Sequence, residues 1–196
     1  MRNNGQNSEK RRCAVKKHSS KQTFGEALLT LARTVPLERI TVKQIVEKSG
    51  LSLQTFYNHF RDKEALILWL HQRGSERALR LLEGKNYSFH DLTMDNIRFY
   101  EHNANYLRSS FGSGVMNPYA EISANNACRF FSIYICRRFD LAELPEDVSF
   151  YLRVYVSACL YIFGEWALKG WEIPAERLAD YLEDGMPEKL KPYLLG

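Results

Sequence analysis

Residues 41–66 constrain the fold of this chain more than any other segment, because two short helical patterns meet there across a glycine. Thr41 and Gln44 have the capping-box spacing, in which each side chain bonds a free backbone N–H at the start of a helix. Gly50 tolerates the left-handed backbone that ends such a helix, and Ser52 can cap the next one. Two short helices joined by a tight turn are therefore expected.

The second of these helices has an apolar side and a polar side. Phe56 and Phe60 lie four residues apart and are expected to point inward. Asp62 can cap a third helix that begins at Lys63, and the N-terminus of that helix offers free N–H groups and a positive dipole end to a phosphate. The pattern predicts a helix-turn-helix, a motif that presents a helix to DNA.

The same residues carry a family resemblance. From residue 50 the sequence reads GLSLQTFYNHF, and from residue 63 it reads KEAL. It resembles the N-terminal domain of TetR-family transcriptional regulators, whose signature is a hydrophobic-Thr-hydrophobic-Tyr-x-His-Phe recognition helix followed by a Lys-x-x-Leu helix start. The resemblance extends upstream over residues 24–44. It implies an all-α fold in which an N-terminal three-helix helix-turn-helix domain precedes a C-terminal helical bundle domain, assembled as a homodimer.

This resemblance also implies which residues meet DNA. Ser52, Gln54, Thr55 and Asn58 are expected to face base edges or sugar-phosphate, Tyr57, His59 and Lys63 to hold phosphates, and Thr41 and Lys43 to add backbone contacts. Leu53 contacts either a thymine methyl group or the core, and the alternative for Tyr57 and His59 is that both only pack the motif. Gln and Asn can pair with adenine, and a good pair of this kind gives about 1–3 kcal/mol of discrimination.

Charge is distributed unevenly along the chain. Residues 1–80 contain 16 Lys and Arg against 7 Asp and Glu, whereas residues 81–196 contain 11 against 16. A basic front on an acidic back favours a DNA-binding protein over a helix-turn-helix that has drifted into protein contact. We expect a flexible basic arm at residues 1–20, the DNA-binding domain at 21–66, and a dimerisation and possible ligand-binding domain at 67–196.

Apolar residues at helical spacing predict further helices, and no strand pattern appears. They are expected from Lys21 to before Pro36, from Lys63 to about Gly84, and over 95–110, 118–138, 146–169 and about 174–184.

The helix over 146–169 is apolar on nearly every face, so it needs two packing partners. We expect a second copy of the protein to be one of them. The predicted dimer interface comprises Tyr155, Cys159, Ile162, Trp166, Leu178 and Leu182. Trp166 followed by Lys169-Gly170 also resembles the C-terminal domain of TetR-like regulators related to dihydroxyacetone-kinase operon activators. A dimer places two recognition helices roughly 34 Å apart, which predicts an inverted-repeat operator.

The aromatic residues of the C-terminal half suggest a ligand pocket. The resemblance implies the same, because the C-terminal domain in this family normally holds a small-molecule pocket. The candidate lining residues are Phe99, Tyr100, Phe130, Tyr134, Tyr151 and Tyr155, although aromatic residues at helical spacing also fit a plain core. The function expected is a cytoplasmic repressor that a small hydrophobic or aromatic ligand releases from double-stranded DNA. The alternative is a ligand-independent or coactivator-type activator.

Other classes of protein find little support. The five histidines form no His-Glu-x-x-His motif, and no nucleophile elbow or glycine-rich phosphate loop appears, so a helical-bundle enzyme is a remote alternative. The four cysteines lack a Cys-x-x-Cys pair, and no metal or cofactor is expected. The longest apolar run, residues 154–163, is shorter than the roughly 20 residues that cross a bilayer, so no membrane partner is expected.

Overall fold

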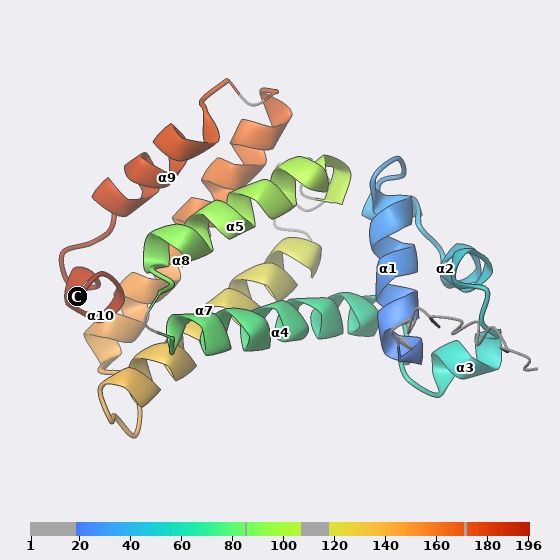
Figure 1. Ribbon diagram of the computed structural model, residues 1–196, viewed down its shortest axis with the longest axis horizontal. Helices are drawn as coiled ribbons and strands as arrows, with labels where there is room; N and C mark the ends of the chain where they lie inside the picture. The colour runs from blue at the N-terminus through green and yellow to red at the C-terminus, as the bar shows by residue number, and fades with distance from the viewer. Residues whose placement is uncertain (1–18, 85, 107–117, 171) are drawn as a thin grey trace, which may run out of the picture.

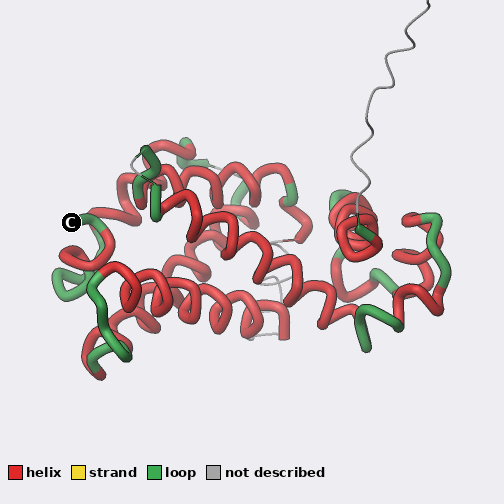
Figure 2. Tube along the Cα trace, turned by 60° about the horizontal axis from the view of Figure 1, so that its bottom comes forward, coloured by secondary structure: helices red, strands yellow, loops and turns green. Residues whose placement is uncertain are grey.

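A computed structural model describes residues 19–84, 86–106, 118–170 and 172–196. Within these ranges the chain is helical and contains no strand (Figures 1 and 2), which confirms the all-α expectation. The α-helices are α1 (Ser20–Ala32), α2 (Val42–Ser49), α3 (Leu53–Tyr57), α4 (Lys63–Leu82), α5 (Phe89–His102), α7 (Pro118–Arg138), α8 (Glu146–Leu168), α9 (Ala175–Asp184) and α10 (Lys191–Leu194). A short 3₁₀ turn, η1, spans Leu37–Arg39.

Helices α1, α2 and α3 cluster at one end of the molecule, around the first turns of α4 (Figure 1). We call α1 to α3 the head, and the helices from α5 to α10 the body. The head is built around Phe24, Ile45 and Phe56, which are completely buried. The ring of Phe56 meets that of Phe24 edge-on at 5.2 Å and lies 5.7 Å from that of Phe60. The inward orientation predicted for Phe56 and Phe60 is therefore confirmed.

Helix α1 begins one residue earlier than its apolar pattern indicated, because Ser19 and Gln22 form a capping box at its start. The predicted arm thus ends in a structured cap, and residues 1–18 of that arm lie outside the described part of the chain. Along α1, Gly25 lies so close to α4 that a Cβ atom there would be 2.8 Å from Leu70 Cδ2 and 3.3 Å from a ring carbon of Trp69. A hydrogen atom at position 25 is what lets α1 rest directly on α4.

Helix α4 runs from the head into the body (Figure 1), where it packs against α7. Helix α7 packs in turn against α8, and α5 lies between α8 and α9. Two apolar clusters fill the body: Ile135, Leu152 and Leu190 are at the centre of one, and Ile97, Phe163 and Leu178 of the other. Long helices that share such clusters form the predicted helical bundle.

The helix predicted over 95–110 begins six residues earlier, at Phe89, because Ser88 and Asp91 form a capping box. It ends at His102, where Asn103 leaves helical geometry with φ −122° and ψ 44°. Residues 107–110 of the predicted helix lie outside the described residues. Helix α10 was not predicted, whereas the bounds of α7, α8 and α9 agree with prediction to within one residue. No helix in the described part of the chain is long and apolar enough to span a lipid bilayer.

Candidate nucleic-acid interface and body cavity

The turn between α2 and α3 has the geometry that its residues predict. Thr41 and Gln44 form the capping box of α2, and Gly50 closes that helix with φ 69° and ψ 10°, in the left-handed region. Ser52 Oγ then accepts the backbone N–H of Thr55, 3.0 Å away, which starts α3. With Leu51 packed against the head core, the two helices are held at a fixed angle.

One flank of α3 stands clear of the head. Leu53 is 49% exposed and Tyr57 is 52% exposed, although both belong to a helix whose other side is fully buried. Leu53 therefore lies outside the core, while the half-exposed ring of Tyr57 still meets that of Phe56 edge-on at 5.6 Å. The other candidates with exposed side chains are Thr41, Lys43, Ser52, Gln54, Asn58 and His59, while Thr55 is half-buried.

Hydrogen bonds order the polar side chains on this flank. Gln54 Nε2 donates to Asn58 Oδ1 at 3.0 Å, one helical turn away. The hydroxyl groups of Ser52 and Thr55 lie 2.8 Å apart. In the Gln54–Asn58 pair, this bond leaves the Gln54 carbonyl and the Asn58 amide N–H groups for other contacts. One donor and one acceptor side by side match the N7 and N6 edge of adenine in the major groove.

Lys63 has a different position from the one predicted. Only 9% of it is exposed, and its ammonium group donates to the carbonyl oxygens of Leu37 and Ile40 at 2.6 and 2.9 Å. Burial lowers the pKa of Lys63. The phosphate contact predicted for this side chain is wrong in this conformation, because the ammonium group joins α4 to the turn between α1 and α2. The start of α4 still follows prediction, since Asp62 Oδ1 accepts the N–H of Ala65 at 2.7 Å.

The positive charge of the front of the chain lies largely outside the helices of the head. Residues 1–18 contain six Lys and Arg and one acidic residue, whereas residues 19–66 contain seven basic and five acidic residues. The head itself is thus only mildly basic.

The structure divides the residues predicted to form the dimer interface. Tyr155, Trp166, Leu178 and Leu182 are at most 8% exposed and lie inside the protomer, because α5, α7 and α9 cover them, and Cys159 is half-buried. The four buried side chains are therefore not available to a partner, whereas Ile162 is 38% exposed and Cys159 is partly exposed. The prediction failed because α8 has apolar residues on nearly every face. Its sequence therefore does not show which face packs against other helices of the same chain.

Helix α8 nevertheless has an uncovered apolar face. Its exposed large side chains are Phe150, Tyr151, Val154, Tyr161, Ile162 and Leu168. Between them lie the small exposed residues Ser157 and Ala158, which would let another helix approach. We call these eight residues the α8 face.

A cavity of about 620 Å³ lies in the body, between α4, α5, α7 and α8, and reaches α1. Among the predicted pocket residues, Phe99, Tyr100, Phe130 and Tyr155 line it. Tyr151 lies on the α8 face instead. His71, Phe163 and Ser123, which the sequence patterns did not single out, also line the cavity.

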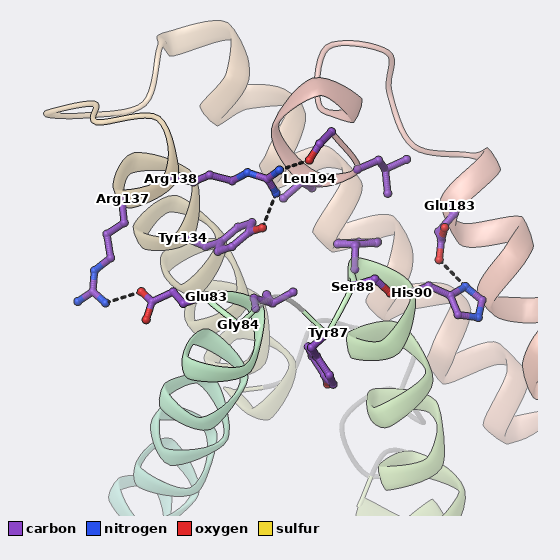
Figure 3. A pocket seen from close by; sticks show the side chains of 14 residues that line it. Glu83, Gly84, Tyr87, Ser88, His90, Tyr134, Arg137, Arg138, Glu183 and Leu194 are labelled. Atoms are coloured by element: carbon purple, nitrogen blue, oxygen red, sulfur yellow. Dashed lines mark hydrogen bonds and ion pairs between the residues drawn. The ribbon is translucent and has the colours of Figure 1, made fainter.

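Tyr134 lines a separate pocket of about 720 Å³ beside the C-terminal end of α4 and α10 (Figure 3). Its hydroxyl accepts a hydrogen bond of 2.6 Å from Arg138. An ion pair of Arg137 with Glu83 at 3.1 Å and a hydrogen bond between His90 Nδ1 and Glu183 Oε1 at 2.7 Å flank this pocket. Tyr134 therefore does not join the other aromatic candidates.

The head touches the body beyond α4 through the end of α5 and the residues that follow. Arg33, which ends α1, donates to Nε2 of His102 at 2.6 Å, and Asn105 Nδ2 donates to the carbonyl of Arg33 at 2.8 Å. A guanidinium only donates, so Nε2 of His102 is the acceptor in this contact. Helix α5 lines the cavity as well, and it connects the cavity to the head.

Comparisons with known proteins agree with this arrangement. Residues 26–69 match the family model of bacterial regulatory proteins of the tetR family. No curated protein matches the sequence.

Solved structures share the fold over most of the chain. The dihydroxyacetone kinase operon activator DhaS is 16% identical, with a TM-score of 0.61 over 89% of this chain and 98% of its own. A TetR transcriptional regulator from Streptococcus agalactiae 2603V is 17% identical, with a TM-score of 0.58 over 86% and 94%. The TetR family repressor AlkX from Dietzia sp. strain DQ12-45-1b, implicated in biodegradation of n-alkanes, is 16% identical, with a TM-score of 0.51 over 90% and 96%. At such identities the likeness establishes the fold.

Proposed function

We propose that this chain, which carries the DNA-binding domain of the TetR family in the helical fold of TetR-family regulators, binds an inverted-repeat operator as a homodimer. The observation that carries the proposal is the exposed flank of α3, where Leu53 and Tyr57 are half out of the protein beside ordered polar side chains. In the major groove, exposed apolar groups on a rigid helix can contact thymine methyl groups, and exposed amide groups can hydrogen-bond to base edges.

Within this interface, Gln54 and Asn58 read bases and Leu53 contacts a thymine methyl group. Tyr57, His59, Lys43 and Thr41 contact the phosphate backbone, together with the free N–H groups at the start of α4. The Ser52 and Thr55 hydroxyls face sugar-phosphate. Lys63 supports the position of α4 and makes no DNA contact of its own.

The α8 face pairs with the same face of a second copy. A two-fold axis through this face makes the interface self-complementary and directs the two heads at successive major grooves. Six large exposed apolar side chains on one helix are costly to leave in water, and burying them provides the driving force for association.

Regulation follows from the cavity and from the contacts of α5 with the head. A small apolar ligand in the cavity releases the operator if it binds more tightly to a conformation whose two heads no longer fit successive grooves. The protein then acts as a repressor. The alternative is an activator, which the similarity of fold to the operon activator DhaS brings into consideration. The position of the operator relative to the promoter decides between them, and a reporter gene driven by the native upstream region measures the sign.

The experiment that tests DNA binding is a titration of labelled DNA from upstream of the gene at several salt concentrations. Binding to an inverted repeat, with an affinity that falls steeply as salt rises, supports the proposal. The matched control is the double variant Gln54→Ala/Tyr57→Ala, which keeps Phe56 and the core of the head. Upstream DNA that binds wild type and this variant equally well would show that the α3 flank is not the reading surface.

A further inference from the structure

The interior of the body cavity is lined by buried apolar side chains. Leu92 comes from α5, Phe130 from α7, and Val156 and Phe163 from α8, and each is at most 8% exposed. The ring of Tyr100 lies 5.3 Å from that of Phe163 and belongs to the same lining. Such a lining accommodates the apolar part of a ligand, because the apolar surfaces of both leave water when they meet.

Three arginines of α4 line the same cavity where it opens to solvent. Arg73, Arg77 and Arg80 lie four and three residues apart, a spacing that places them on one face of the helix, and all three are exposed. We call them the α4 arginines. Gly74 lines the cavity beside Arg73, and a Cβ atom at this glycine would meet nothing within 4 Å. The cavity therefore has an open, cationic mouth above an apolar interior.

The positive charge of this mouth is not neutralised by ion pairs. Within the part of the chain that the structure describes, none of the α4 arginines lies within ion-pair distance of a carboxylate, and Arg73 stacks on the ring of Trp69 at 5.5 Å. Like charges one helical turn apart repel each other. An anion that binds between these guanidinium groups would relieve that repulsion.

Two carboxylates also line the cavity, Glu26 of α1 and Asp95 of α5. Neither forms an ion pair with the α4 arginines. Asp95 already accepts the hydroxyl of Tyr87 at 2.8 Å and lies 4.0 Å from the guanidinium of Arg98. Three cations against two carboxylates leave the lining positive, and the positive groups are gathered on one face of one helix.

We propose that the cavity binds an amphipathic organic carboxylate, with its apolar body among the buried side chains and its carboxylate at the mouth, held by the α4 arginines. This inference rests on the proposed role of the cavity as the ligand site and specifies the class of ligand. Guanidinium groups donate paired hydrogen bonds that match the geometry of a carboxylate. At an open mouth the carboxylate also keeps part of its hydration, so its burial costs less than in a closed cavity.

The test is calorimetric titration of the purified full-length protein, without DNA, with two series of probes. One series is decanoate, decanol and decylamine, and the other is 2-naphthylacetate, 2-(2-naphthyl)ethanol and 2-(2-naphthyl)ethylamine. In at least one series the acid should bind about five- to tenfold more tightly than the alcohol, the equivalent of about two exposed ion pairs, and the amine should bind most weakly. Raised salt should weaken binding of the acid and leave that of the alcohol nearly unchanged.

Two variants locate the two ends of the ligand. The triple variant Arg73→Gln/Arg77→Gln/Arg80→Gln should abolish the preference for the acid and leave the affinity for the alcohol within about twofold of wild type. Ala78 lines the cavity between the α4 arginines, and Ala78→Phe, which fills space inside it, should weaken the acid and the alcohol alike.

The matched control is Arg98→Gln/Arg129→Gln/Arg177→Gln, which removes the same charge from exposed positions outside the cavity and should keep the preference for the acid. No binding of either acid, equal binding of acid and alcohol by wild type, a preference that survives in the α4 triple variant or is lost in the control, or unchanged affinities in Ala78→Phe would each overturn the inference. Failure of the proposed function is distinguishable from these outcomes, because operator binding is measured separately and in the absence of any probe.

Discussion

Lys63 provides the sharpest test of how the head is held together. Its ammonium group satisfies the carbonyls of Leu37 and Ile40, at the turn that leads from α1 to α2. The substitution Lys63→Met keeps an unbranched apolar side chain and removes both of these hydrogen bonds. The Leu37 carbonyl keeps a second donor, the N–H of Ile40 at 3.2 Å, so the change removes one of its two hydrogen bonds. The loss at the Ile40 carbonyl costs about 1–3 kcal/mol, the penalty for a buried carbonyl whose hydrogen bond is removed.

Part of this cost is offset, because the variant no longer buries an ammonium group. We expect the free energy of unfolding to fall by about 1–2 kcal/mol, measured by urea denaturation at a fixed protein concentration. Under conditions in which the variant is still folded, its operator affinity should change less than about twofold, and the slope of log affinity against log salt should stay the same.

Lys43→Met is the control, since Lys43 is exposed on α2. It should leave stability within about 0.5 kcal/mol of wild type and reduce the salt slope by about 1. The reverse pattern in Lys63→Met, with unchanged stability and a salt slope lower by about 1, would refute the reasoning and return Lys63 to the phosphate contacts.

Three further outcomes are expected. Gln54→Ala should change which operators are preferred in a selection of bound oligonucleotides, by about 1–3 kcal/mol at the bases that it reads; an equal loss on every operator would remove Gln54 from the base-reading residues. Tyr161→Glu should make the protein a monomer in sedimentation at micromolar concentration, whereas Leu68→Glu, an exposed apolar position on α4, should leave it a dimer; a dimeric Tyr161→Glu would contradict pairing through the α8 face. His71 has a pKa of about 4 when folded and 6.5 when unfolded, so the unfolded chain binds the extra proton as pH falls. Wild type should therefore lose about 3 kcal/mol of stability between pH 6.5 and 4 relative to His71→Gln, and parallel urea-denaturation profiles for the two proteins would show that His71 titrates normally.

Local signals in the sequence were sufficient for much of the head. The spacing of Thr41 and Gln44, the glycine at position 50 and the caps at Ser52 and Asp62 each act over three or four residues, and each forms as predicted. Phe56 and Phe60 followed from helical periodicity, which also acts over a few residues. In the head, the groups whose partners lie nearby in the chain could be paired from the sequence alone.

Most of what the sequence patterns missed depends on contacts between distant residues. The carbonyls that hold Lys63 lie 26 and 23 residues before it, so no spacing rule identifies them. The start of α5 was missed because its capping box has Asp91 in place of the usual Glu or Gln at the third helical position. The covered side of α8 depends on where α5, α7 and α9 lie, which an apolar pattern on every face of one helix does not contain.

The close approach of Gly25 to Leu70 and Trp69 bears on how such proteins can be recombined. Trp69 and Leu70 pack against the same core as Phe24 and Phe56, so the interlocking surface of the head continues past residue 66 into α4. A hybrid sensor that joins this head to a foreign effector module at position 66 would pair the glycine with unrelated side chains. A fusion point after Leu70 would transfer Trp69 and Leu70 together with Gly25. The packing of α1 on α4 that holds the DNA-binding head would then be preserved in the hybrid.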